Sequence, residues 1–220
     1  MKIKIKDFVE IEYTGVIKEG NVIFDTTSEK VAKENNLFDK DADYGPVVIC
    51  IGEEQVLKGI DSALVGKEPG EYKIELKAEQ AFGNKDPKLI QLMPTSKFRQ
   101  QQIQPVPGLQ VNIDGIFGIV KTVSGGRTLV DFNHPLAGKD LIYNLKVNGI
   151  LDDDKKKIIA YLKMAFGIKN CEVELEGGNA RAELKSELSE KLKKEMEKKI
   201  MDAIPSIKKI EFVIEREGKK

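Results

Sequence analysis

The sequence predicts an α+β protein, and three observations support this fold class. Residues 1–83 contain short runs in which apolar and polar residues alternate, such as FVEIEYTGVI and EYKIELKA, and this period of two is typical of half-buried strands. Two helical patterns interrupt the runs, SEKVAKENN and EQVLKGIDSALVG. After residue 151 the patterns follow the order α-β-β-α-β. We expect the first region to form a curved antiparallel sheet wrapped on one short helix.

The second helical pattern is the better defined of the two. Apolar residues repeat at helical spacing in EQVLKGIDSALVG, and Gly66 follows them at a position that can end a helix. We therefore place the short helix that packs on the sheet in this segment.

Residues 84–133 differ in composition from the chain on either side. They open with NKDPKLIQLMP and a Gln-rich stretch with several prolines, and then give the alternating runs VNIDGIFGIV and TLVDF, joined through SGG. This pattern predicts a small all-β module. The next segment, HPLAGKDLIYNLKVNGIL, returns to the alternation of the first region. We therefore expect one domain made of residues 1–83 and 134–151, with residues 84–133 inserted into it.

The rest of the chain, residues 152–220, predicts a third domain. Asp152 or Asp153 can cap a helix that Gly167 ends, and CEVEL, ARAEL, a long helix and IEFVI follow. A domain of this size has a small core whose stability alone is marginal. A sheet face or edge shared with a second copy would supply the missing burial, so we expect a homodimer through this domain.

Charge and cysteine content exclude several classes of function. The 36 basic and 36 acidic residues cancel, so no net field favours nucleic acid or a membrane as partner. No apolar stretch has the length of a membrane span, and we expect a cytoplasmic protein. Cys50 and Cys171 lie far apart without metal-ligand spacing. This predicts buried thiols, with a disulfide as the alternative, and neither a metal nor a cofactor.

Five motifs carry a family resemblance. IEYTG, VIFDTT, IGEEQVLKGIDSALVG, AFG and HPLAGKDLIYNLKV occur in this order, and their order and spacing resemble the FKBP family of peptidyl-prolyl isomerases. The insertion after AFG resembles the SlyD branch, in which an insert-in-flap module binds unfolded chains, and the C-terminal region resembles long archaeal members. The resemblance implies a peptidyl-prolyl cis-trans isomerase with chaperone activity, whose partners are unfolded or partly folded proline-containing polypeptides.

The resemblance also implies a proline-sized pocket. The residues at the matching positions are Tyr13, Phe24, Asp25, Val56, Leu57, Ile60, Phe82 and Tyr143. Two of them depart from the family pattern. Ile60 stands where human-type enzymes have Trp, which makes the pocket floor shallower, and Phe82 lacks the hydroxyl that Tyr would offer to a substrate backbone.

Asp25 has two interpretations. A carboxylate directly after the apolar run VIF resists burial without a partner. Taken alone, Asp25 would be a helix cap or a turn residue. Its neighbours favour the other interpretation, in which the apolar run builds the pocket wall and Asp25 gives that wall a polar edge.

The insertion also has two interpretations. Its apolar residues are either core strands and a linker, or an apolar groove for unfolded segments. The groove would consist of Leu89, Ile90, Leu92, Met93, Phe98 and Ile103. A client-binding function without useful turnover, as a holdase chaperone or assembly scaffold on an FKBP fold, is the alternative to the enzyme.

Overall fold

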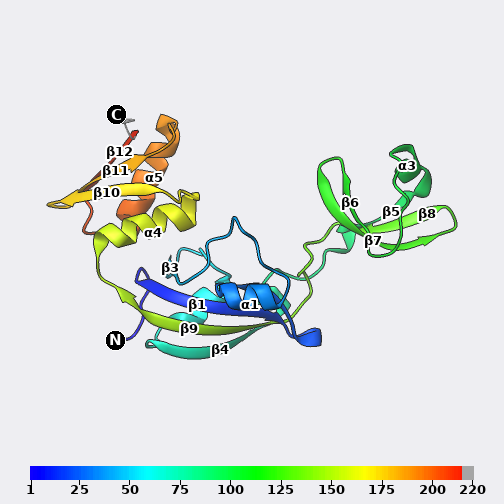
Figure 1. Ribbon diagram of the computed structural model, residues 1–220, viewed down its shortest axis with the longest axis horizontal. Helices are drawn as coiled ribbons and strands as arrows, with labels where there is room; N and C mark the ends of the chain where they lie inside the picture. The colour runs from blue at the N-terminus through cyan, green and yellow to red at the C-terminus, as the bar shows by residue number, and fades with distance from the viewer. Residues whose placement is uncertain (215–220) are drawn as a thin grey trace. The chain divides into compact units, whose positions relative to one another are not determined.

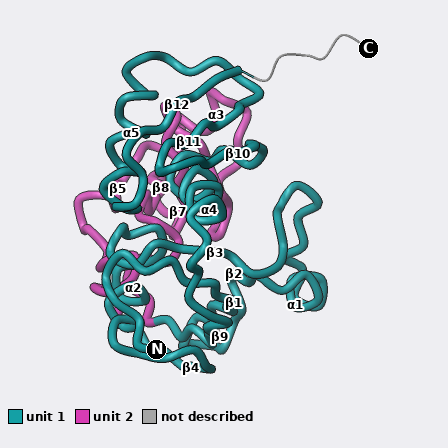
Figure 2. Tube along the Cα trace, turned by 90° about the vertical axis from the view of Figure 1, so that its left-hand side faces the viewer, with its two compact units in different colours: residues 1–76, 141–220 teal, residues 77–140 magenta. Residues whose placement is uncertain are grey.

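The computed structural model describes residues 1–214 (Figure 1). The chain forms two compact units, one made of residues 1–76 with the chain from residue 141 onward, and the other of residues 77–140 (Figure 2). Residues 215–220, which end the predicted third domain, lie outside the described residues. Within residues 1–214, no helix combines the length and apolar character needed to span a membrane.

A five-stranded antiparallel sheet forms the first part of the first unit. Its central strand β1 pairs with β9 over its whole length on one edge, and on the other edge it pairs with β3 at its start and β2 at its end. β4 pairs with the outer edge of β9. The bounds are β1 Phe8–Ile17, β2 Val22–Thr26, β3 Val47–Cys50, β4 Gly70–Leu76 and β9 Leu141–Leu151. The predicted antiparallel sheet is confirmed.

Two short helices accompany this sheet. The helix α1 (Glu29–Glu34) begins at Ser28, whose Oγ accepts a hydrogen bond from the Val31 N–H at 3.4 Å. The helix α2 (Lys58–Leu64) buries Ile60, Asp61 and Leu64 and packs against β4. A 3-10 turn, η1 (Glu19–Asn21), joins β1 to β2. The predicted helix on the sheet is therefore α2.

The C-terminal part of the same unit has the predicted order α-β-β-α-β. β10 and β11 form a hairpin, and β12 returns through α5 to lie parallel to β11. The bounds are α4 Asp154–Phe166, β10 Cys171–Glu176, β11 Asn179–Leu184, α5 Glu190–Ala203 and β12 Lys209–Ile214. Of the two candidate caps for α4, Asp153 is the one used, because its Oδ1 accepts from the Lys156 N–H at 3.2 Å. Gly167 ends the helix with φ 69°.

The C-terminal part shares its core with the first sheet. Phe8 of β1 and Cys50 of β3 are each 1% exposed, and they belong to the same buried cluster as Tyr161 of α4 and Met196 of α5. Apolar burial is the main stabilising term in folding. The small core therefore obtains part of its burial within one chain, so burial alone does not require a second copy. The homodimer stays a prediction.

The second unit is a four-stranded sheet with one short helix. The strand order is β5-β8-β7-β6, and all pairs are antiparallel. The bounds are η2 Ala78–Gln80, η3 Pro87–Leu89, β5 Ile90–Pro94, α3 Thr95–Gln100, β6 Gln110–Ile113, β7 Ile116–Ser124 and β8 Arg127–Asp131. The small β module is confirmed. The sequence interpretation contained no helix here, but α3 forms because Phe98 packs into the core of the module with Val111, Val120 and Val130.

The second unit leaves and rejoins the chain at neighbouring positions. β4 ends at Leu76 and β9 begins at Leu141, and these two residues are paired across the sheet. At the base of the module, Asp131 is 4% exposed and accepts hydrogen bonds from Lys85 Nζ at 2.6 Å and Asn133 Nδ2 at 2.8 Å. Asn133 Oδ1 in turn accepts from the Asp86 N–H at 2.8 Å. These side chains tie the two ends of the module together.

Candidate functional site

Four of the predicted site residues meet on the strands β1, β2 and β9. The ring of Tyr143 lies 5.7 Å from that of Tyr13, tilted by 58°, and 5.9 Å from that of Phe24, edge-on at 87°. The Tyr13 hydroxyl donates a hydrogen bond to Asp25 Oδ2 at 3.0 Å. The three rings thus form an apolar wall with one polar pair, the combination expected of a small ligand site.

Asp25 is a partner of Tyr13 and not the cap of α1. Ser28 occupies the cap position, so the helix-cap interpretation of Asp25 is wrong. Asp25 is exposed, which keeps its carboxylate in contact with solvent while it holds the tyrosine hydroxyl. The role of Asp25 as the polar edge of a pocket wall stays a prediction.

Burial keeps both tyrosines in their neutral form. Burial raises the pKa of Tyr13 above its ordinary value, and the negative charge of Asp25 and the hydrogen bond to it raise this pKa further. Burial also raises the pKa of Tyr143, with a smaller contribution from Asp25. Tyr13 therefore remains a hydrogen-bond donor to Asp25 throughout the physiological pH range.

Gly15 is a structural position of the candidate site that the sequence analysis missed. It lies opposite Tyr143 on β9 and opposite Asp25 on β2. A Cβ atom at Gly15 would lie 2.7 Å from Phe24 Cζ and 3.2 Å from Tyr143 Cε1. The two rings can meet over the strand only because residue 15 has no side chain. A glycine inside an alternating strand pattern is a signal of such close approach, and it could have identified this position.

Two threonines fix the backbone of Tyr13. The Thr27 Oγ1 accepts from the Tyr13 N–H at 2.9 Å, and the Thr27 N–H donates to the Tyr13 carbonyl at 3.0 Å. The Thr26 hydroxyl donates to the same carbonyl at 3.2 Å. Both threonines are buried. The second half of VIFDTT therefore sets the position of Tyr13, a role that the sequence alone did not reveal.

Val56, Leu57 and Ile60 lie on α2 and on the segment that leads into it. Val56 and Leu57 are half-buried, and Ile60 is 2% exposed. The preceding loop, residues 51–57, is held by Asp61, which is 5% exposed. Its carboxylate accepts from the Gly52 N–H at 2.8 Å and the Glu54 N–H at 3.2 Å. A buried carboxylate needs such partners, so Asp61 is a second position that the sequence analysis missed.

Phe82 belongs to the other unit. Its ring stacks on that of His134 with centroids 4.4 Å apart and an interplanar angle of 5°. The two residues lie near the two ends of the module, and the His134 Nδ1 accepts from the Leu136 N–H at 3.2 Å. The assignment of Phe82 to the pocket stays a prediction.

The predicted groove residues of the module differ in exposure. Leu89, Ile90 and Leu92 are exposed at 40%, 36% and 56%. Met93 and Ile103 are half-buried against the core of the module. Phe98 is 2% exposed inside that core, which corrects the expectation that it lines a surface groove.

The most exposed aromatic side chain of the module is one that the sequence analysis assigned to a core strand. Phe117 is 73% exposed and Ile116 is 58% exposed at the start of β7. They follow the turn at Asp114 and Gly115, both of which have positive φ, so the pair stands at the tip of the β6–β7 hairpin. In the sequence, Ile116 and Phe117 directly follow the turn residues Asp114 and Gly115, and side chains beside a turn are poorly buried. This position could have indicated that the two side chains are exposed.

Among residues 1–214, no group of three or more His, Cys, Asp or Glu side chains could hold a metal ion. What the four contacting residues offer is an apolar aromatic surface with one hydrogen-bonded polar edge. Such a surface can accept a small apolar ring and remove water from it.

Comparison with known proteins identifies two family models in the chain. Residues 1–99 match the model of the FKBP-type peptidyl-prolyl cis-trans isomerase, and residues 91–136 match the model described as FKBP26, IF domain. The second match falls within residues 77–140, the unit that forms the inserted sheet.

Three relatives are similar to parts of the chain. The short-type peptidyl-prolyl cis-trans isomerase of Methanocaldococcus jannaschii is 32% identical over 149 residues, which are 67% of this chain and 94% of that protein. A probable FKBP-type 16 kDa peptidyl-prolyl cis-trans isomerase of Pseudomonas fluorescens is 30% identical over 50% of this chain and 75% of its own length. The FKBP-type isomerase SlyD of Helicobacter pylori is 28% identical over 57% of this chain and 70% of its own.

One assignment follows from these matches together with the structure, in which three strands carry an aromatic wall and a helix packs on the sheet. The chain belongs to the FKBP-type peptidyl-prolyl cis-trans isomerase family and carries an FKBP26-type IF domain as its insert.

Proposed function

We propose that the protein isomerises prolyl bonds in a pocket built on Tyr13, Phe24, Asp25 and Tyr143, with Val56, Leu57 and Ile60 of the same unit as its further residues. The observation that supports this is the meeting of three rings from three strands around the Tyr13–Asp25 hydrogen bond. Leu57 is the N-cap residue of α2, so the hydrogen bonds of the helix do not use its N–H, which can hold a substrate carbonyl.

The chemistry requires neither a nucleophile nor a metal. Rotation about a prolyl bond is opposed by a barrier of about 18 to 20 kcal/mol, because the nitrogen lone pair is delocalised into the carbonyl. An apolar pocket removes water from the carbonyl oxygen and so weakens the charge-separated planar form. A pocket that binds the twisted imide better than either planar isomer lowers the barrier further. Phe24 and Tyr143 hold the ring, and Tyr13 with Asp25 supplies the polar orientation.

The test is cis/trans exchange of a short prolyl peptide, measured by magnetisation-transfer NMR. The wild-type chain should accelerate exchange, and the double substitution Asp25→Ala with Phe24→Ala should remove most of this acceleration. Asp152→Ala is the matched control, because Asp152 is exposed and Asp153 is the cap of α4. A folded wild-type protein that does not accelerate exchange would leave the holdase or scaffold function on an FKBP fold.

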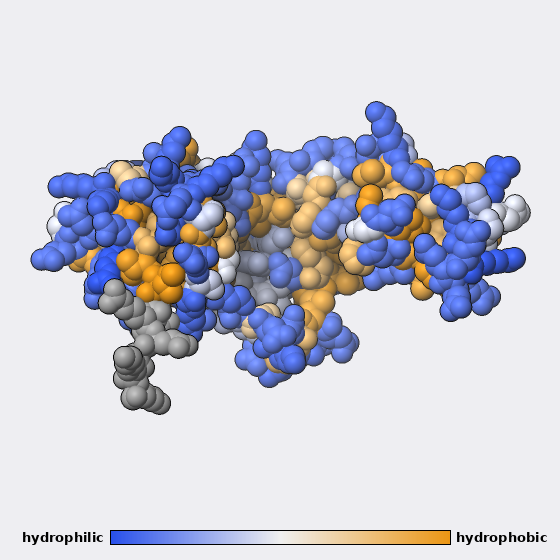
Figure 3. All heavy atoms as spheres, turned by 90° about the horizontal axis from the view of Figure 1, so that it is seen from above, coloured by the Kyte–Doolittle hydropathy of each residue, from blue (hydrophilic) through white to orange (hydrophobic). Residues whose placement is uncertain are grey.

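We propose in addition that the insert binds unfolded chains. Its exposed apolar side chains, with Phe117, Ile116 and Leu92 the most exposed, support this function. Figure 3 shows hydrophobic surface in orange on the insert, at the right of the view. Exposed apolar patches are typical of protein-binding surfaces. Phe117 is thereby added to the predicted groove, and Phe98 is removed from it.

The matching experiment compares two substrates. Phe117→Ser with Leu92→Ser should leave exchange of a short peptide unchanged and should slow the proline-limited refolding of an unfolded protein several-fold. Val22→Ser is the control, since Val22 is an apolar residue in the first unit that is about as exposed (55%) as Leu92 (56%). Equal losses on both substrates would contradict a separate client-binding surface.

We further propose a homodimer through residues 152–220 and a cytoplasmic location. β12 is an edge strand of its sheet, and Ile214 on it is 48% exposed, so a second copy can extend the sheet there. Sedimentation at several concentrations tests the dimer, and a monomer at all of them would contradict it. The free thiols of Cys50 and Cys171 suit a reducing compartment.

A further inference from the structure

Tyr161 on α4 makes a contact that the proposed reaction does not use. Its side chain is 1% exposed and lies in the core shared by the C-terminal part and the first sheet. The Tyr161 hydroxyl donates a hydrogen bond to Glu53 Oε2 at 2.8 Å. Glu53 lies 108 residues earlier in the chain, in the loop 51–57. The C-terminal part therefore touches the segment that leads to Val56 and Leu57.

The loop 51–57 has a defined shape that several hydrogen bonds hold, among them those from the Ile51 N–H to the Asp7 carbonyl at 2.9 Å and from the Cys50 N–H to Gln55 Oε1 at 2.8 Å. Gly52 has φ +92° and Glu54 has φ +51°, so the backbone turns twice through the left-handed region around Glu53. Asp61 of α2 accepts from the N–H groups of Gly52 and Glu54. The Tyr161 hydroxyl holds the side chain of Glu53, the residue between Gly52 and Glu54. Loss of the Tyr161 hydroxyl removes this partner from Glu53 while the backbone hydrogen bonds to Asp61 remain.

The hydrogen bond to Glu53 is required by the burial of Tyr161. A buried tyrosine hydroxyl needs an acceptor, because an unpaired polar group inside a core is costly. Burial raises the pKa of Tyr161, and the hydrogen bond and charge of Glu53 raise it further. The ring itself is fixed by its neighbours, with centroids 6.3 Å from Phe8 and 6.2 Å from Phe166. The Tyr161 hydroxyl therefore has a fixed position, and its hydrogen bond fixes the side chain of Glu53.

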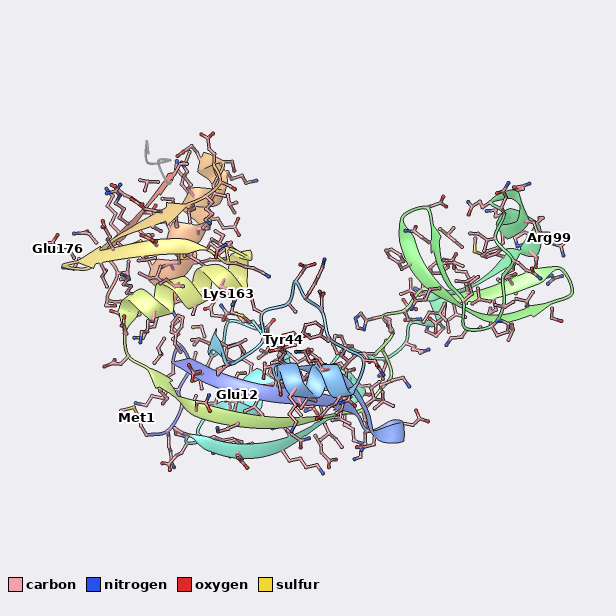
Figure 4. All side chains as sticks on the ribbon, viewed as in Figure 1. Met1, Glu12, Tyr44, Arg99, Lys163 and Glu176 are labelled. Atoms are coloured by element: carbon pink, nitrogen blue, oxygen red, sulfur yellow. The ribbon has the colours of Figure 1, made fainter. Side chains whose placement is uncertain are left out.

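A second pair of contacts ties α4 and the residues after it to the loop before β3. Lys163 Nζ lies 2.9 Å from Asp43 Oδ2, and Lys169 Nζ donates to the Asp41 carbonyl at 3.2 Å. Figure 4 shows Lys163 on α4 above the loop that carries Tyr44. These groups are exposed, and exposed ion pairs contribute little. The contact of the buried Tyr161 with Glu53 is the one expected to control the geometry of the loop 51–57.

We propose that Tyr161 is a positioning residue for the prolyl pocket, acting through Glu53 on the loop that presents Val56 and the Leu57 N–H. The C-terminal part thus has a direct role in the isomerase site besides any role in assembly. This inference rests on the proposed function, because it assigns the loop to that pocket.

The test uses Tyr161→Phe, which removes the hydroxyl and keeps the ring. The expected result is a fall of about three- to tenfold in kcat/KM on a short prolyl peptide, the size of one hydrogen bond. Glu53→Ala should give a similar fall, and the double variant should lose no more than either single variant. Glu53→Gln keeps an acceptor oxygen and should retain most of the activity. Tyr72→Phe is the control, because its hydroxyl donates to the Glu68 carbonyl at 2.6 Å, outside this loop.

Two further readouts keep the outcome decisive. Urea unfolding must show that Tyr161→Phe remains folded. In Tyr161→Phe and Glu53→Ala, the NMR resonance of the Leu57 amide should shift and its amide hydrogen should exchange faster with solvent. Neither change should occur in Tyr72→Phe. An unchanged Leu57 resonance with unchanged kcat/KM would overturn the proposal. If the wild-type chain fails to accelerate exchange at all, the proposed function fails, while the Leu57 resonance still tells whether Tyr161 sets the loop.

Discussion

Gly15 and Tyr143 face each other across the β1–β9 pair, and the ring of Phe24 closes over the space above Gly15. Gly15→Ala would place a methyl group 2.7 Å from Phe24 Cζ. We expect this change to push Phe24 away from Tyr143 and to cost about 1 to 3 kcal/mol of stability through overpacking. Exchange on a short prolyl peptide should slow by an order of magnitude or more.

The control for this variant is Gly149→Ala on β9, where a Cβ would meet nothing within 4 Å. If Gly15→Ala retained wild-type exchange together with wild-type stability, the close approach of the rings would have no role in the reaction.

The raised tyrosine pKa values predict the alkaline limb of the pH profile. Because burial and Asp25 move the pKa of Tyr13 above its ordinary value, neither its hydrogen bond nor activity should be lost as the pH rises to about 10, the ordinary tyrosine value. Exchange rates between about pH 7 and 10, corrected for the uncatalysed reaction, provide the measurement. In Asp25→Asn the pKa of Tyr13 should move down, because a negative charge is removed. A loss of activity near pH 9 in the wild type would contradict this.

The carboxylate at the base of the insert predicts a different, acidic transition. Burial alone would raise the pKa of Asp131, but hydrogen bonds from Lys85 and Asn133 lower it to about 2. An unfolded Asp has a pKa of about 3.9. The ionised form therefore stabilises the insert by roughly 2 kcal/mol above pH 4, and this is lost as the pH falls from about 4 to 2.

Amide hydrogen exchange of β7 and β8 in the full chain, from about pH 5 to 2.5, measures this loss after correction for intrinsic exchange. Asp131→Asn should already be destabilised near neutral pH and should show a flatter dependence. If the hydrogen-exchange protection of the wild type stayed constant over this pH range, Asp131 would not contribute to the stability of the insert in the way proposed.

The shared core predicts the effect of removing residues 152–220. Phe8 and Cys50 would lose the cover of α4 and α5, and the shortened chain should be less stable by several kcal/mol.

Burial, with the nearby acidic groups, raises the pKa of the Cys50 thiol to about 12. In the full chain Cys50 should therefore react with a thiol reagent much more slowly than the half-buried Cys171. Equal rates would indicate that the C-terminal part does not stay docked on the sheet.

The sequence predicted the features that local pattern determines. Alternation identified the strands of the first sheet and of the C-terminal sheet. In the insert it missed β5, whose segment was interpreted as a linker or a groove, and it gave β6 and β7 as one run. The residue types typical of helix N-caps identified Asp153 as one of two candidate caps of α4. The family resemblance supplied Tyr13, Phe24, Asp25 and Tyr143, which the fold brings together.

Features that depend on contacts between distant segments could not be predicted. Thr27 reveals its role only when β2 lies beside β1, and Asp61 only when the loop before α2 turns back over it. The helix α3 was missed because TSKFRQ has a single apolar residue, too few for a helical period. The docking of α4 on β1 and β3 joins residues separated by more than a hundred positions, for which no local pattern exists.

The pairing of Leu76 with Leu141 has a consequence for the history of the fold. If residues 77–140 were absent, a short turn could join the two strands as an ordinary hairpin, and the sheet would keep its register. A single insertion or deletion event could therefore add or remove the whole module without redesign of the isomerase strands. An ancestral sheet could in this way acquire the whole insert in one step, and descendants could exchange inserts of different sequence at the same junction.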